Sequence, residues 1–177
     1  MALLVAAAIL ACSPVGADVA ATRFTGKVVR VRDGDTIEVL RPGAPTRVRV
    51  RVFGIDCPER GQAYSQKARQ LTSLLAFGRE VTVVVRDHDA YGRTVGDVIL
   101  PDGRDLGLEL VTAGLAWQYR RYSNDAKVQA AEDRARAAQR GLWADAHPVP
   151  PWEFRHADRK PRPTRKARPP RRTPAAA

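Results

Sequence analysis

Polar and apolar positions alternate in short segments through the first hundred residues, and these segments are rich in Val and Ile. Such alternation is typical of half-buried strands, and Asp33-Gly34 is typical of a tight turn between two of them. Arginines and valines alternate in one segment, so Arg47, Arg49 and Arg51 are predicted to share one face of a strand. Five strands are predicted, two within residues 25–39 and the others over 46–55, 80–86 and 94–100.

Three other segments repeat apolar residues at helical spacing and end near a glycine. Helices are predicted over 63–77, 106–113 and 126–139, with Gly78 capping the first. The apolar face of the first comprises Ala68, Leu71, Leu74 and Leu75. The order favours a mainly β, α+β protein, with five antiparallel strands in an OB-fold Greek-key barrel and about three α-helices. Periodicity alone leaves another small α+β sheet open.

The composition indicates one folded domain, predicted over 23–146, with a basic C-terminal flank. The 177 residues include 30 Lys and Arg against 19 Asp and Glu, a formal net charge of +11. Residues 155–177 hold nine Lys or Arg and one Asp, which is +8 of that total. Eight of the 13 prolines lie in 148–174. We therefore predict a disordered tail over 148–177, which either contacts nucleic acid or another anionic surface or keeps the chain soluble.

Residues 2–11 are almost purely apolar but too short to span a bilayer, which is typical of a signal peptide. The small residues Gly16 and Ala17 favour cleavage after residue 17, so we expect a secreted or periplasmic protein. The alternative is a lipoprotein signal that ends at Cys12 and anchors the chain to a membrane. Beyond this segment no apolar run is long enough for a transmembrane span.

Several polar residues at strand ends and in loops have the chemistry needed to hydrolyse a phosphodiester. Asp35 and Asp56 supply hard oxygen donors, which suit Ca²⁺ or Mg²⁺ better than zinc. Arg51 and Arg93 carry forked donors that match a phosphate. Glu59 follows Asp56 by three residues and is suited to take a proton from water.

Four segments strengthen this hypothesis because they occur together and in order: VRDGDTIEV (31–39), RVFGIDCPE (51–59), DAYGR (89–93) and AGLAW (113–117). Over about residues 24–143 the chain resembles the thermonuclease family, the staphylococcal-nuclease-like (SNase-like) secreted nucleases. The resemblance implies an OB-type barrel and a Ca²⁺-dependent endonuclease, with Mg²⁺ the less favoured ion. It also implies DNA and RNA as substrates and 3′-phosphate ends as products.

The resemblance assigns roles to the residues that match the motifs. Asp35 and Asp56 match the metal-binding carboxylates, and Cys57 lies where the family offers a backbone carbonyl to the metal. Glu59 matches the residue held to be the general base or to orient the attacking water.

The remaining matches concern the substrate. Arg51 and Arg93 match the pair that binds the scissile phosphate and stabilises its pentacoordinate transition state. Tyr91 lies where the family has a Tyr beside the nucleotide phosphate, and Tyr119 roughly where another lines the base pocket. Ala90 departs from the basic residue often found there, which affects contacts with the substrate more than the chemistry.

Two other functions stay open from the sequence. One is a non-catalytic OB-fold module that binds nucleic acid, although such modules usually lose the acidic and Arg residues that this chain keeps. The other is an envelope lipoprotein whose basic tail docks on an anionic surface. We expect a monomer in each case.

Overall fold

The computed structural model describes residues 22–158. The predicted signal peptide, Cys12 and the tail beyond residue 158 lie outside the described residues. The elements in chain order are β1 (Arg23–Val31), β2 (Thr36–Leu40), β3 (Arg47–Val52), β4 (Ile55–Asp56), α1 (Ser65–Ala76), β5 (Glu80–His88), β6 (Thr94–Ile99), α2 (Leu106–Thr112), β7 (Trp117–Gln118), α3 (Ala126–Ala137), a 3₁₀ turn (Gly141–Ala144) and α4 (Pro151–Asp158).

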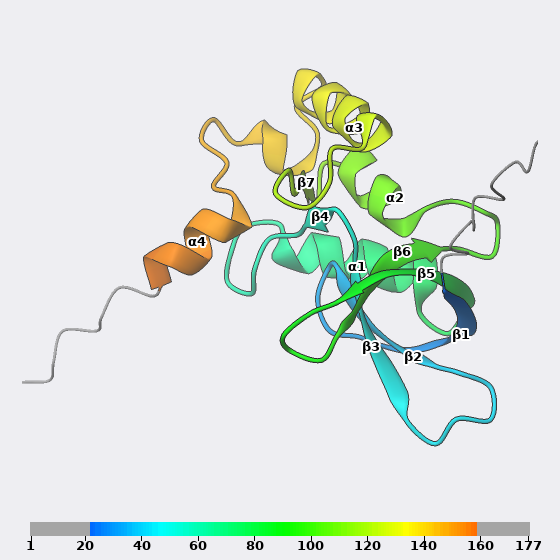
Figure 1. Ribbon diagram of the computed structural model, residues 1–177. Helices are drawn as coiled ribbons and strands as arrows, with labels where there is room; N and C mark the ends of the chain where they lie inside the picture. Colours follow the sequence, from blue (N-terminus) through cyan, green and yellow to red (C-terminus); the bar gives the residue numbers. More distant parts are fainter. Residues whose placement is uncertain (1–21, 159–177) are drawn as a thin grey trace, which may run out of the picture.

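Five strands close a barrel in the order β1-β2-β3-β6-β5, and β5 pairs back onto β1 (Figure 1). This confirms the predicted five-stranded OB-type barrel within an α+β fold. The expectation that all the strands are antiparallel is wrong at one position, because β3 and β6 run parallel with Val50 opposite Thr94. Helix α1 and strand β5 lie between them in the chain, so β6 returns in the direction of β3 and closes the barrel.

The single strand predicted over 46–55 is wrong, because the chain turns at Gly54 and forms two strands. Gly54 has φ +72°, a left-handed conformation that glycine adopts without strain. Strand β3 stays in the barrel, whereas β4 pairs with β7 in a separate two-stranded sheet, with Asp56 opposite Trp117. The turn therefore directs Asp56 away from the barrel wall toward the connection with the helices.

Helix α1 confirms most of its predicted face, with Ala68 and Leu75 buried. The prediction that Leu74 lies on the buried face is wrong, because its side chain is 71% exposed. The buried face instead includes Thr72. Gly78 follows the helix at φ +74°, as its predicted capping role requires. Helices α2 and α3 lie together on one side of the barrel (Figure 1).

Residues 151–158 form helix α4, so the prediction of a disordered tail from residue 148 is wrong for this segment. Pro151 occupies the first helical position, where its missing N–H breaks no hydrogen bond. Trp152 then packs edge-on against Trp117, with ring centroids 5.7 Å apart. Apolar contact with the body thus orders a segment whose composition alone is typical of a tail. In Figure 1 this helix (orange) lies to one side of the barrel.

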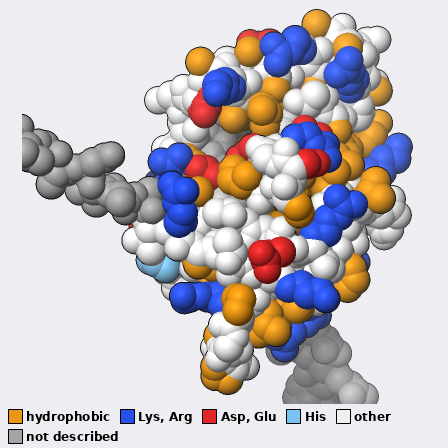
Figure 2. Space-filling view, turned by 90° about the vertical axis from the view of Figure 1, so that its right-hand side faces the viewer, with side chains coloured by type: hydrophobic (Ala, Val, Ile, Leu, Met, Phe, Trp, Pro, Cys, Tyr) orange, Lys and Arg blue, Asp and Glu red, His pale blue; other side chains and the backbone are white. Residues whose placement is uncertain are grey.

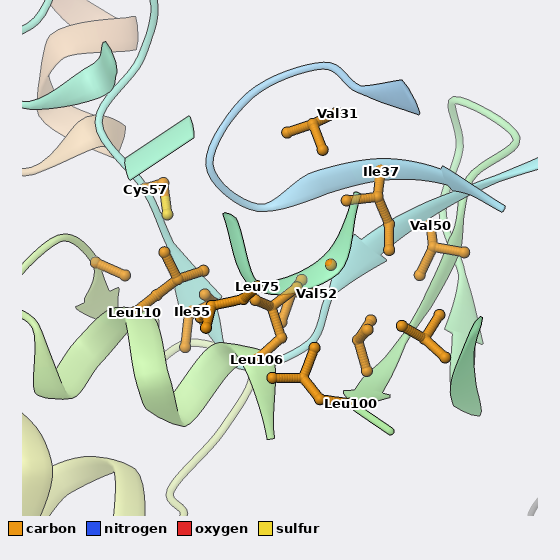
Figure 3. Packing of buried hydrophobic residues seen from close by; sticks show 14 of the residues in the cluster. Val31, Ile37, Val50, Val52, Ile55, Cys57, Leu75, Leu100, Leu106 and Leu110 are labelled. Atoms are coloured by element: carbon orange, nitrogen blue, oxygen red, sulfur yellow. The ribbon is translucent and has the colours of Figure 1, made fainter. Parts of the chain in front are cut away.

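The main core fills the barrel and extends toward α1 and α2 (Figure 3). Its fully buried members include Val28, Ile37, Val50, Leu106 and Leu110. A second cluster of buried side chains lies beyond it, formed by Trp117, Ala135, Leu142 and Trp143. Strands β2, β3 and β4 are packed into the first cluster, which gives the polar residues at their ends a rigid support.

The surface of the described residues is rich in cations. Figure 2 shows Lys and Arg side chains spread over the face in view, with fewer acidic side chains among them. Large exposed apolar residues include Leu74 and Phe77 at the end of α1 and Tyr122 after β7. None of the helices within residues 22–158 has the length and apolarity needed to cross a membrane.

Gly114 offers a test of the close contact between the end of α2 and the start of the 3₁₀ turn. Its carbonyl oxygen accepts from Leu142 N–H at 2.8 Å, and a Cβ at this position would overlap the carbonyl oxygen of Arg140. We expect Gly114→Ala to lower the free energy of unfolding well beyond the ~1–2 kcal/mol of a left-handed alanine. The matched control is Gly103→Ala, where φ is +84° but no atom lies within 4 Å of the added Cβ. Equal losses of stability in urea titrations of the two variants would contradict the packing argument.

Candidate active site

Two buried carboxylates share one arginine at the centre of the candidate site. Arg51 Nη1 donates to Asp35 Oδ1 at 2.8 Å, and its Nη2 donates to Asp56 Oδ1 at 2.6 Å. Asp35 is 3% exposed and Asp56 is 0% exposed. Two neighbouring anions removed from water repel each other and need positive charge nearby. The fork of Arg51 supplies it and thereby unites three of the predicted site residues.

The turn between β1 and β2 is held in place by α1. The Thr72 hydroxyl donates to the carbonyl oxygen of Gly34, the residue before Asp35. A Cβ on Gly34 would lie 2.7 Å from Ala68 Cβ and 2.8 Å from Cys57 Sγ, so only glycine fits between α1 and β4. The close approach of these elements places the Asp35 carboxylate against the start of the loop that follows β4.

Cys57 contacts the candidate site through its backbone and not through its thiol. Its N–H donates to Asp35 Oδ2 at 2.8 Å, while its side chain lies buried in the main core (Figure 3). Burial raises the pKa of the Cys57 thiol well above its usual value, and the nearby Asp35 and Asp56 raise it further. The thiol therefore stays protonated, so any contribution from this residue to a metal comes from the main chain.

Glu59 lies on the loop after β4 in a turn closed by Gln62. The Gln62 side chain accepts from Glu59 N–H at 2.7 Å, and Gln62 N–H donates to the Glu59 carbonyl at 2.9 Å. The Glu59 side chain is 38% exposed and receives a hydrogen bond from Arg155 Nη1. Glu59 therefore borders the buried carboxylates with its oxygens still open to solvent.

Arg155 of α4 contacts the site from outside, and the sequence did not predict this contact. Its Nη2 donates to Asp56 Oδ2 at 2.7 Å, and its Nη1 lies 3.2 Å from Asp56 Oδ1. In the sequence it is one of the charges of the predicted tail, and its separation of 99 positions from Asp56 leaves no local signal for the contact. The apolar Trp152 just before it is the one feature that could have suggested docking.

Arg93 and Tyr91 belong to the loop between β5 and β6, and among the described residues no hydrogen bond joins them to the two buried carboxylates. Arg93 Nε donates to Asp89 Oδ2 at 2.6 Å, and its guanidinium carbon lies 5.5 Å from the centre of the Tyr91 ring. Strand pairing nevertheless puts this loop beside the site, because Thr94 pairs with Val50 next to Arg51. Tyr91 is 74% exposed and free to meet a ligand.

Tyr119 directly follows β7, and its N–H donates to the Gly54 carbonyl just before β4. Its ring stacks on Trp152 of α4 at a centroid distance of 5.4 Å and an interplanar angle of 2°. A pocket of about 380 Å³ adjoins this stack. Its lining is mostly aromatic and basic, but it includes one carboxylate: Trp117, Gln118, Tyr119, Arg120, Arg121, Glu132, Arg136, Trp152 and His156. The structure therefore places Tyr119 next to a concave surface of nucleotide-like size.

Electrostatics in the site reflect crowding of acidic groups. Burial raises the pKa of Asp56 above its usual value, although hydrogen bonding from Arg155 opposes this effect. Desolvation, and then the neighbouring Asp35, raise the pKa of Asp33, but its side chain is exposed, so solvent weakens this effect. Asp33 therefore lies in the turn that the sequence predicts, next to the site.

The donor set fits an oxygen-seeking divalent cation. Asp35 and Asp56 both accept hydrogen bonds from the Arg51 guanidinium, and Cys57, which follows Asp56, donates its N–H to Asp35. Within residues 22–158 no group of three or more His, Cys, Asp or Glu side chains forms a cage, so backbone carbonyl and water must complete any coordination shell. Hard carboxylate oxygens with carbonyl and water ligands are typical of Ca²⁺ sites.

Comparison with known proteins assigns the family. The model of the staphylococcal nuclease homologue family matches residues 49–145. A protein named uncharacterized endonuclease from Escherichia coli O157:H7 is 44% identical over 131 residues, which are 74% of this chain and 84% of the relative. The micrococcal nuclease of Shigella flexneri is 40% identical over 77% of this chain and 83% of its own, and Protein ParB of Escherichia coli is 42% identical over 87% and 91%. The chain therefore belongs to the family of staphylococcal nuclease homologues.

Proposed function

We propose that this chain is a Ca²⁺-dependent endonuclease that hydrolyses the phosphodiester bonds of DNA and RNA and leaves 3′-phosphate ends. The observation that carries the proposal is the Asp35–Arg51–Asp56 cluster with Glu59 beside it. Family membership and relatives named as endonucleases agree with this chemistry. The predicted signal peptide adds export to the secreted or periplasmic space to the proposal.

The two aspartates would hold the cation, with the Cys57 carbonyl as a main-chain ligand. Bound there, Ca²⁺ would polarise the scissile phosphate and favour ionisation of a water molecule. Arg51 keeps the two carboxylates together before the ion arrives, because it donates to both. Preorganisation of this kind lowers the reorganisation needed when a charged ligand binds.

Glu59 would accept the proton of the attacking water. Its side chain is partly exposed and lies beside Asp56, because Arg155 contacts both residues. A carboxylate in this position takes a proton at its free oxygen as the oxygen of water attacks phosphorus in line with the leaving group. The turn closed by Gln62 limits movement of the Glu59 backbone during this step.

Arg51 and Arg93 would stabilise the charge that develops on the phosphate oxygens. A guanidinium carries five N–H donors, and the contacts to Asp35 and Asp56 use two of those of Arg51. Arg93 donates its Nε–H and its backbone N–H to Asp89, so its terminal NH₂ groups remain available to bind a substrate. Donors aimed at developing negative charge are a major source of rate enhancement in phosphoryl chemistry.

Recognition would depend on the phosphate backbone and on stacking, with little discrimination between bases. Cations are spread over the surface in Figure 2. The family resemblance puts Tyr91 beside the phosphate and Tyr119 near the base pocket. Phosphate contacts carry no sequence information, and every base offers a face for stacking. The proposal is therefore a nuclease with low sequence specificity.

The first test uses Glu59. Purified protein should degrade plasmid DNA and RNA with Ca²⁺ and stop when a chelator is added. Glu59→Gln should lower kcat about 10²–10⁴-fold, because the amide is isosteric but does not accept the proton. Glu80→Gln, an exposed carboxylate at the start of β5, is the matched control and should keep full activity. A folded protein that shifts DNA on a gel without degrading it under Ca²⁺ or Mg²⁺ would instead indicate a binding module.

A second test separates the two arginines. Arg51→Lys should lower the free energy of unfolding by about 1.5–3 kcal/mol, because an ammonium group does not reproduce both hydrogen bonds to the buried carboxylates. It should also lower activity. Arg93→Lys should lower activity while leaving the midpoint of thermal unfolding unchanged, because the loop of Arg93 is at the surface. The same loss of stability in both variants would contradict the bridging role assigned to Arg51.

A further inference from the structure

Helix α4 contacts the candidate active site at two separate points. Arg155 hydrogen-bonds to Asp56 and Glu59, and Trp152 stacks on Tyr119. The two α4 residues are three positions apart, which places them on the same face of a helix. One short helix thus contacts the proposed metal ligand Asp56, the proposed general base Glu59 and the proposed base-stacking residue Tyr119.

The first contact uses the oxygens that a cation would need. Asp56 accepts three hydrogen bonds, one from Arg51 and two from Arg155. A carboxylate offers about four lone-pair sites, so Arg155 occupies about half of them. Among the described residues Asp56 Oδ2 has Arg155 as its one hydrogen-bond partner. A divalent cation that binds Asp56 through this oxygen must therefore compete with the guanidinium.

The same guanidinium also engages Glu59. Its Nη1 donates to Glu59 Oε1, so the carboxylate proposed to take a proton is already accepting a charge-assisted hydrogen bond. Arg155 therefore occupies oxygens of both carboxylates at once, the one proposed to bind the cation and the one proposed to accept the proton.

The second contact closes one face of Tyr119. The rings of Tyr119 and Trp152 are nearly parallel, and their centroids are 5.4 Å apart. A base inserted between two parallel rings needs about 7 Å, because carbon atoms in contact lie ~3.5–4.0 Å apart. The face of Tyr119 that Trp152 covers is therefore closed to a nucleotide.

Helix α4 is short and is held to the body through Arg155, the partly buried Trp152 and the buried Pro151. The helix has eight residues, which is below the length at which an isolated helix is stable in water. Besides the contacts already given, the segment before it is held by Gln62 Nε2, which donates to the Val149 carbonyl at 3.1 Å. Val149 itself is exposed. Figure 1 shows the helix outside the barrel and apart from α2 and α3.

We propose that α4 is an autoinhibitory strap, in which Arg155 competes with the divalent cation for Asp56 and Trp152 competes with the substrate base for Tyr119. The inference rests on the proposed function, because it assigns to that site an internal competitor. The cation alone breaks the contact of Arg155 with Asp56, and the nucleotide alone breaks the stacking of Trp152 on Tyr119. Both ligands together displace the helix.

Calorimetric titration of Ca²⁺ into the full chain without substrate tests the first half. Arg155→Ala should bind Ca²⁺ about ten-fold or more tightly than the unaltered chain, because charge-assisted hydrogen bonds no longer oppose the ion. It should also reach half its maximal rate at a correspondingly lower Ca²⁺ concentration, with no loss of kcat at saturation. Arg134→Ala, an exposed arginine on α3, is the matched control and should leave Ca²⁺ affinity unchanged.

Trp152→Ala tests whether Trp152 competes with a substrate base for Tyr119. The substitution does not alter the contacts of Arg155 with the two carboxylates directly. In the presence of a chelator, which prevents hydrolysis, it should bind a fluorescent single-stranded oligodeoxynucleotide about five-fold or more tightly, since stacking on Tyr119 becomes possible. Its Ca²⁺ affinity should change much less than that of Arg155→Ala. In the unaltered chain, Ca²⁺ and the oligonucleotide added together should shift tryptophan emission to the red, and this shift should be smaller in Trp152→Phe.

The outcomes separate this inference from the proposed function. Unchanged or weaker Ca²⁺ binding by Arg155→Ala, in protein whose thermal unfolding shows it is folded, would overturn the strap. A lower kcat at saturating Ca²⁺ would do the same and would make Arg155 part of the catalytic machinery. If no variant binds Ca²⁺ or degrades nucleic acid, the proposed function fails and the strap fails with it.

Discussion

The fork of Arg51 between Asp35 and Asp56 is the interaction on which the rest of the site depends. The two carboxylates come from different elements, the turn before β2 and the short strand β4, and both are buried. Without the guanidinium, two adjacent anions would lie in a low-dielectric environment with strong mutual repulsion. Burial opposes the charged form of Arg51, but the two aspartates outweigh this effect and raise its pKa above the usual value.

The fold supplies the geometry that this cluster needs. Arg51 lies on β3, which pairs with β2 on one side and β6 on the other, so its backbone has little freedom. Thr72 holds the Gly34 carbonyl, and Cys57 N–H holds Asp35 Oδ2, so the turn and the strand meet in one arrangement. The residues that carry the chemistry are therefore placed by packing around the barrel, and the loops add the more exposed groups.

The sequence predicted the barrel and most of its strands because alternation of polar and apolar residues is a local property. It also predicted Asp35, Arg51, Asp56 and Glu59 as one set, and the structure brings these four together, although their roles stay predictions. The break at Gly54 was missed because one glycine inside an alternating run does not by itself distinguish a strand from a turn. Leu74 was misplaced because helical spacing fits two overlapping faces of α1.

The role of α4 was not predictable from local pattern. It belongs to a flank that is rich in Pro and Arg, and the features that order it are distant in the chain: Trp117, on which Trp152 packs, and Asp56, 99 positions before Arg155. Contacts between segments far apart in the chain thus account for the order of α4, which sequence periodicity missed.

The most direct test of the account is the number of Ca²⁺ ions bound by the intact chain and by Asp35→Asn, measured by equilibrium dialysis. Asparagine keeps the shape of the side chain but removes the charge that attracts the ion. The account predicts one bound ion in the unaltered chain and at least about ten-fold weaker binding in the variant, with the fold retained. Equal binding by both proteins would contradict the claim that these two carboxylates form the cation site.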